Sequence, residues 1–150
     1  MGIKTDLEEA VKEAMKAHDE DKKRVYRMAL ASIKFSEKNL GKGLDEGEVT
    51  AIIQKEIKIR NETLAEAKKA GRAEMIANAE EEISLLEAFL PKQLSAEELK
   101  AIVLDAIREN NAQSIADMGK VMKSVLEKAK GKAPNDVVSK TVKECLLKND

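Results

Sequence analysis

Apolar residues recur every three or four positions along most of this chain, which is the spacing of helices with one buried face. Nowhere do four or more β-branched residues alternate with polar ones, as they would in a half-buried strand. Aromatic residues make up only 2% of the chain and charged residues 37%, which also favours amphipathic helices over strands. The sequence therefore predicts an all-α protein. In residues 46–70 the apolar stripe runs through Val49, Ile52, Ile53, Ile57, Leu64 and Ala67.

Four short motifs indicate helix starts, because each places a capping side chain three residues before a carboxylate that can bond back to it. Glycine and proline interrupt the helical spacing between them and indicate where helices end. A last apolar stripe from Val137 to Leu146 predicts that the C-terminal helix packs against the rest of the chain. The predicted starts are Thr5 with Glu8, Asp45 with Glu48, Ser95 with Glu98, and Ser114 with Asp117.

Pro91 is the predicted boundary between two subdomains, since proline disfavours a helical conformation in the preceding residue and Ser95 caps a new helix soon afterwards. The charge balance changes at the same point. Residues 1–91 contain 16 basic and 19 acidic side chains, whereas residues 92–150 contain 11 and 9. We expect an N-terminal helical subdomain over 1–91 and a small three-helix C-terminal subdomain over 92–150.

Several classes of protein do not fit this sequence. No stretch approaches the roughly 20 apolar residues of a membrane span, and the N-terminus lacks the basic-then-apolar order of a signal peptide. The single cysteine, Cys145, has no partner for an internal disulfide and is predicted to pack as a small hydrophobic residue. We therefore expect a cytoplasmic protein without a membrane anchor.

The search for catalytic residues returns almost nothing. His18 is the only histidine, and no cysteine cluster accompanies it to complete a zinc site. It is interpreted as a solvated loop residue. The glycine-rich segment 41–47 lacks the spacing of a phosphate-binding loop and is interpreted as a flexible turn. These observations predict a protein that is not an enzyme and that has no catalytic residue, no metal site and no cofactor.

The sequence feature that does suggest a site is an excess of lysine, with seven lysines against two acids between residues 118 and 143. Helical spacing predicts that most of them lie opposite the apolar faces of two helices. Such a surface suits a polyanion, because lysines that meet phosphates release counterions. Lysine is also a common solvent-facing helix former, so a purely solvated face is the alternative. The candidate nucleic-acid-binding residues are Lys120, Lys123, Lys130, Lys132, Lys140 and Lys143.

A second basic group occupies residues 22–38 and includes Arg24 and Arg27. Nearby acids at 19–21 allow intramolecular pairing or a subdomain interface. The alternative to nucleic-acid binding is therefore a protein-interaction module, which would use this helix or an apolar stripe to engage a partner.

Six segments in this order and spacing resemble the GatB/YqeY family over nearly the whole chain. They are RMALASIKFSE (27–37), EIKIRNET (56–63), AGRAE (70–74), EAFLPKQLS (87–95), DMGKVM (117–122) and KGKA (130–133).

The resemblance to stand-alone YqeY-like proteins implies an all-helical fold with a smaller C-terminal part. That part is similar to the tail of the GatB subunit of the glutamine-dependent tRNA amidotransferase, and related modules are appended to some glutaminyl-tRNA synthetases. In those proteins the module is regarded as a tRNA-contacting element. The resemblance implies tRNA as a ligand and an amidotransferase or aminoacyl-tRNA synthetase as a partner. A carbon–nitrogen ligase activity with glutamine as amido-nitrogen donor would belong to the larger protein.

The matched segments DMGKVM and KGKA place Lys120, Lys130 and Lys132 among the RNA contacts that the resemblance implies. Lys123 is a neighbour on the same predicted face. The family often has Asp-Gly after the second segment, whereas this chain has Pro134 and Asn135.

Overall fold

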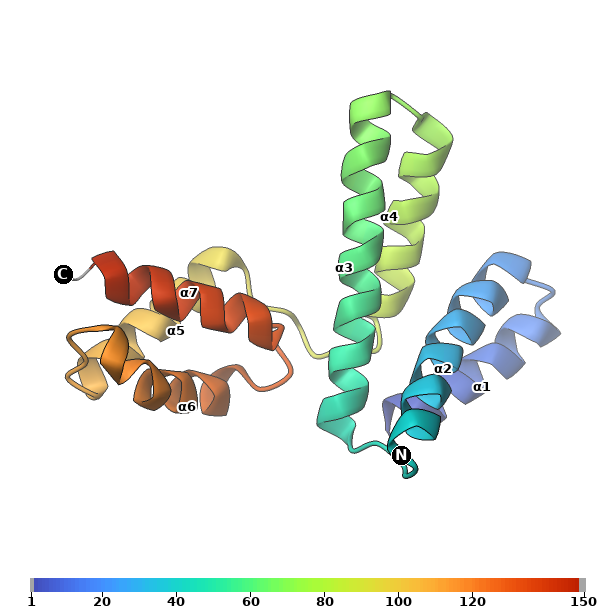
Figure 1. The fold of residues 1–150 in the computed structure, drawn as a ribbon. Coiled ribbons are helices and arrows are strands. Elements are labelled where there is room, and N and C mark those ends of the chain that lie inside the picture. Colours follow the sequence, from blue (N-terminus) through green and yellow to red (C-terminus); the bar gives the residue numbers. More distant parts are fainter. Residues whose placement is uncertain (1, 149–150) are drawn as a thin grey trace. The chain divides into compact units, whose positions relative to one another are not determined.

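The regular elements of the chain are all helices in the computed structural model, which describes residues 2–148. No strand occurs among these residues, so the predicted all-α class is confirmed. Contacts within the chain divide it into two compact units, Met1–Pro91 (unit 1) and Lys92–Asp150 (unit 2). The elements, drawn in Figure 1, are α1 (Ile3–Lys16), α2 (Glu20–Leu40), α3 (Glu46–Ala70), α4 (Ala73–Glu87), α5 (Ala96–Glu109), a short 3₁₀ helix (Ile115–Asp117), α6 (Met118–Ala129) and α7 (Asn135–Lys148).

Two predicted helix starts are confirmed by complete capping boxes. At α3, the Asp45 carboxylate accepts from the backbone N–H of Glu48 at 2.8 Å, and the Glu48 carboxylate accepts from the N–H of Asp45 at 3.2 Å. At α5, Ser95 and Glu98 form the same reciprocal pair at 3.1 and 3.0 Å. Both helices therefore begin where local hydrogen bonding alone predicts.

The predicted helix start at Thr5 is wrong, because α1 already begins at Ile3. The N–H of Ile3 donates to the Glu46 carboxylate at 2.9 Å, so a side chain from the start of α3 satisfies the first turn of α1. Thr5 consequently lies inside the helix. The start of α2 has a local cap that the sequence analysis missed, since Asp19 accepts from the N–H of Lys22 at 3.1 Å.

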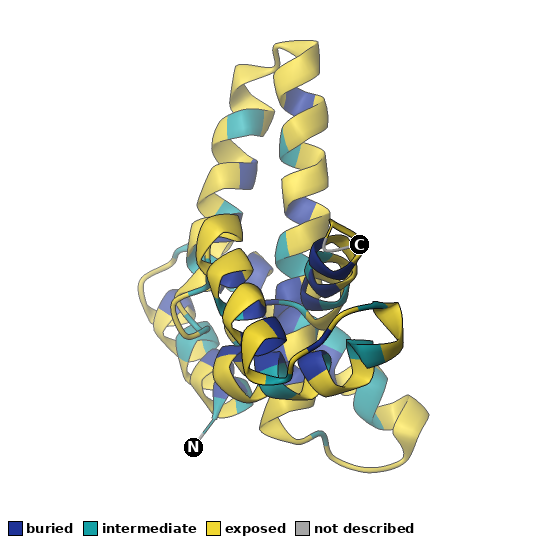
Figure 2. Cartoon of the chain, turned by 90° about the vertical axis from the view of Figure 1, so that its left-hand side faces the viewer, coloured by how far each residue is buried: buried dark blue, intermediate teal, exposed yellow. Residues whose placement is uncertain are grey.

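Unit 1 consists of two helix pairs, α1 with α2 and α3 with α4, whose members lie side by side (Figure 1). Buried residues recur along these helices at intervals rather than over whole turns, as Figure 2 shows. Tyr26 packs edge to face against Phe89, with ring centroids 5.5 Å apart. Burial, and secondly the Asp19 carboxylate, raises the pKa of Tyr26. The largest fully buried side chains of the central cluster are Leu7, Val25, Ile33, Ile53 and Leu86.

A buried arginine joins three helices of unit 1. Arg60 of α3 is only 7% exposed, and its guanidinium pairs with Glu56 at 2.8 Å and with Glu82 of α4 at 3.1 Å. The Ser32 hydroxyl of α2 donates to the other oxygen of Glu56 at 2.5 Å. Arg24, also on α2, lies 3.9 Å from Glu82. This network gives structural roles to side chains of the segments 27–37 and 56–63.

Unit 2 packs α5, α6 and α7 around one apolar cluster. The last helix docks against the others as predicted, and Cys145 is only 5% exposed within the cluster. Val137 differs from its predicted buried position. It is 43% exposed, because the first turn of α7 turns Val138 rather than Val137 toward the cluster. The fully buried valines and leucines are Leu99, Val103, Val121, Val125, Val138, Val142 and Leu146.

Candidate nucleic-acid interface

All six lysines of the predicted interface belong to unit 2 and are exposed. Within residues 2–148, none of them forms an ion pair with a carboxylate. Their charges are therefore available to a ligand. Lys120 and Lys123 lie on α6, Lys130 and Lys132 in the turn that follows, and Lys140 and Lys143 on α7.

The flank of α6 that faces α5 is identified by two contacts. Lys128 pairs with Glu109 at 3.1 Å, and Ser124 accepts from the Asn110 amide at 2.9 Å. Successive residues of a helix are about 100° apart, so Lys123 lies away from this flank, whereas Lys120, four residues before Ser124, lies near it. Lys128 is one of the seven lysines between residues 118 and 143, but its charge is already paired with Glu109.

On α7 the lysines occupy the side opposite the buried valines. Val138 and Val142 are fully buried, and Lys140 lies between them in the sequence but on the outer side of the helix. Lys143 follows three residues later and therefore shares that side. The helices α6 and α7 pack against each other, so the two lysine pairs lie on adjoining elements. Acidic Glu127 and Glu144 are exposed on the same elements and reduce the local excess of positive charge.

The turn after α6 is held in place by the segment that precedes α5. Gly131 has a φ of +72°, a left-handed conformation that glycine adopts without strain. Its carbonyl accepts from the Gln93 side chain at 2.8 Å, and the Lys132 carbonyl accepts from the N–H of Leu94 at 2.8 Å. Lys130 and Lys132 thus project from a backbone that is already ordered, which lowers the entropic cost of binding a ligand.

Pro134 and Asn135, where the sequence departs from the usual family pattern, form the start of α7. The helix begins at Asn135, and the Pro134 carbonyl accepts from the N–H of Val138 at 3.0 Å. Proline is well suited to a helix start, since its missing N–H would have no partner there. The two residues that differ from the usual family pattern therefore follow Lys130 and Lys132 in the chain.

The start of α6 is fixed by Asp117. Its carboxylate accepts from the N–H of Gln113 at 2.9 Å and from that of Ser114 at 3.4 Å. These two hydrogen bonds, and to a smaller degree the charge of Lys120, hold the pKa of Asp117 below its usual range. The predicted start at Ser114 thus corresponds to the short 3₁₀ helix, with α6 beginning at Met118.

Gly119 is a residue that the sequence analysis did not single out. It lies in the first turn of α6, is exposed, and a Cβ placed on it would meet no atom within 4 Å. Packing therefore gives no reason for glycine at this position, although glycine disfavours helices by about 0.5–1 kcal/mol relative to alanine. A bare backbone beside Lys120 is a point where a ligand could approach closely.

The remaining candidates behave as solvated or structural residues. His18 is exposed in the turn between α1 and α2, as predicted. Lys23 and Arg24, in the second basic group, pair with Glu20 at 2.9 Å and Glu82 at 3.9 Å, so intramolecular pairing accounts for these two. In the part of the chain that the structure describes, no three His, Cys, Asp or Glu side chains cluster as metal ligands. None of the described helices combines the length and apolar character of a membrane span.

A model of the Yqey-like protein family matches residues 4–146. The chain belongs to the YqeY-like family. The match includes both units and all six candidate lysines, and it confirms the family that the six sequence segments indicated. No curated protein matches the sequence.

Proposed function

We propose that this YqeY-like protein is a non-catalytic, cytoplasmic tRNA-binding accessory module. The lysines of α6, α7 and the intervening turn would contact the phosphate backbone. The observation that carries the proposal is the set of six exposed lysines on adjoining elements that form no ion pairs within residues 2–148, two of them in an ordered turn. The similarity of the family to the tail of the tRNA-dependent amidotransferase supports tRNA as the ligand. An amidotransferase or an aminoacyl-tRNA synthetase would be the enzyme that the module assists.

The composition of unit 2 favours folded RNA over a single strand. Tyr26, Phe35 and Phe89 are the only aromatic residues of the chain, and all three precede residue 92. Proteins that bind single strands usually stack bases on aromatic side chains. Without them, the lysine surface would recognise backbone geometry, which a folded tRNA presents in a fixed arrangement.

The direct test compares a folded tRNA with an unstructured RNA of equal length across a series of salt concentrations. If about four lysines meet phosphates, log K should fall with log salt at a slope of roughly −3. We expect tighter binding to the folded tRNA near physiological salt. Equal and weak binding to both RNAs would contradict the proposal.

Gly119→Ala should affect the stability of the helix and the binding of tRNA in opposite directions. We expect the free energy of unfolding of unit 2 to rise by about 0.5–1 kcal/mol, because the added methyl group has open space and favours the helix. The same methyl group should weaken tRNA binding several-fold by keeping the RNA backbone away. Thermal unfolding and tRNA titration measure the two effects.

Gly43→Ala in unit 1 serves as the control, since its added methyl group makes only an ordinary contact, at 3.8 Å from Glu37. It should leave tRNA affinity unchanged. If Gly119→Ala binds tRNA as tightly as the original chain, Gly119 is not a point of close approach.

A further inference from the structure

The outer face of α2 exposes apolar side chains that the fold of unit 1 does not use. Met28 is 47% exposed and Phe35 is 66% exposed, with exposed Ala31 between them. These positions lie on one side of the helix, because they are separated by three and four residues. Buried residues of α2 that include Tyr26 and Ile33 lie on the opposite side. The three apolar residues form a stripe roughly 10 Å long.

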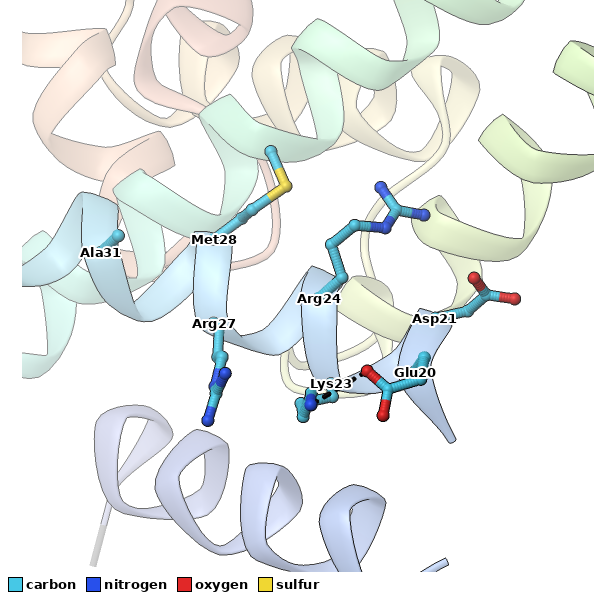
Figure 3. Close-up of a pocket in the computed structure, with 7 residues that line it drawn as sticks. All are labelled: Glu20, Asp21, Lys23, Arg24, Arg27, Met28 and Ala31. Atoms are coloured by element: carbon cyan, nitrogen blue, oxygen red, sulfur yellow. Dashed lines mark ion pairs between the residues drawn. The ribbon is translucent and has the colours of Figure 1, made fainter. Parts of the chain in front are cut away.

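A surface concavity of about 560 Å³ lies over the first half of this stripe. Figure 3 shows Met28 and Arg27 projecting to different sides of α2, with Arg24 nearer the start of the helix. Lys23 is held by its ion pair with Glu20. The concavity is thus apolar at one end, at Met28 and Ala31, and is lined by charged side chains toward the start of α2.

The charges around the stripe are predominantly positive toward the C-terminal end of α2. Within residues 2–148, Arg27, Lys34 and Lys38 form no ion pair with a carboxylate, and the polar contact of Arg27 is with the Met15 sulfur at 3.8 Å. Glu37 is already paired with Lys4 of α1 at 2.9 Å. The acidic residue Asp21 lies at the other end of α2, in its first turn.

We propose that this face of α2 is a docking surface for an acidic amphipathic helix of a protein partner. Apolar residues of the partner would cover Met28, Ala31 and Phe35, and its carboxylates would meet Arg27, Lys34 and Lys38. A helix laid along a helix matches the spacing of the stripe. The proposal does not rest on RNA binding by unit 2.

Nucleic acid fits this face less well than a protein helix does. The centre of the face is apolar and the cations flank it, whereas a phosphate backbone requires cations along its path. An acidic amphipathic helix satisfies both the apolar centre and the cationic flank.

The test is photo-cross-linking in cells that make the protein, with p-benzoylphenylalanine in place of Phe35 in the full chain. The cross-linked polypeptide is digested and the attached segment is mapped by mass spectrometry. A second chain carries the same photoreactive residue in place of Ala77, which is exposed on α4 and serves as the control position. We expect the Phe35 position to capture an acidic amphipathic segment of another protein.

Binding of the mapped segment, as a synthetic peptide, is then measured with the purified chain. Phe35→Ala should weaken it about tenfold or more, as expected for an aromatic anchor. The pair Lys34→Glu and Lys38→Glu should weaken it by a similar factor and should make binding less sensitive to salt. All three side chains are exposed, so these variants should fold like the original chain.

Several results would overturn the proposal. These are cross-linking to RNA, to a second copy, to another part of the same chain, or to a segment without acidic amphipathic character. Cross-linking no stronger than at the Ala77 position would also overturn it, as would a mapped segment that binds Phe35→Ala as tightly as the original chain.

Discussion

Replacing Arg60 with alanine should lower the free energy of unfolding of unit 1 by about 3 kcal/mol. The guanidinium is buried, and its removal leaves the Glu56 and Glu82 carboxylates close together in a partly buried site without their main cation. The change also opens a space between α3 and α4. Urea unfolding followed by circular dichroism measures the loss, and amide hydrogen exchange assigns it to α2, α3 and α4.

Two variants control this experiment. Arg72→Ala removes an exposed arginine that forms no ion pair with a carboxylate within residues 2–148 and whose guanidinium donates to the Met75 sulfur, and it should change stability by no more than about 0.5 kcal/mol. Adding Glu56→Gln and Glu82→Gln to Arg60→Met should recover much of the loss, because no unpaired charge then remains. A loss below about 1 kcal/mol for Arg60→Ala would mean that the network does not hold the three helices together.

The sequence predicted the elements that depend on contacts between near neighbours. The capping boxes at Asp45 and Ser95 join residues three positions apart, so a local pattern was sufficient to locate two helix starts. The start of α1 instead depends on Glu46, which is 43 positions from Ile3. The Arg60 network likewise joins Glu82, which is 22 positions away. Neither contact leaves a periodic signal, so the sequence alone could not locate them.

The candidate interface also combines features that depend on near neighbours in the sequence with features that depend on distant contacts. Helical spacing correctly predicted that the lysines face solvent, because burial of Val121 and Val125 on α6 determines which side remains outside. It could not predict that Lys128 is paired, since Glu109 belongs to another helix. The hydrogen bond from Gln93 to the Gly131 carbonyl, across 38 positions, is also a product of the tertiary fold. The order of the turn therefore became visible only in the structure.

Reversing two charges, with Lys120→Glu and Lys130→Glu, should weaken tRNA binding by about 10- to 100-fold near physiological salt. Lys120 lies on α6 and Lys130 in the ordered turn, so the pair tests both parts of the surface. Each change replaces an attraction to phosphate with a repulsion. The salt slope should become shallower by about 2, because two phosphate contacts are lost. Filter binding or fluorescence anisotropy over a salt series gives both quantities.

The matched control reverses two exposed lysines of unit 1, with Lys12→Glu and Lys69→Glu. It changes the net charge by the same amount, so any effect of overall charge on tRNA binding is common to both variants. If the two variants weaken binding equally, attraction to the whole protein is responsible and the lysines of unit 2 form only a solvated face. If only the Lys120 and Lys130 variant loses affinity while its helix content and unfolding temperature are unchanged, the positions of these charges determine binding. A difference in the salt slope between the two variants would then distinguish direct phosphate contact from a change in the shape of the surface.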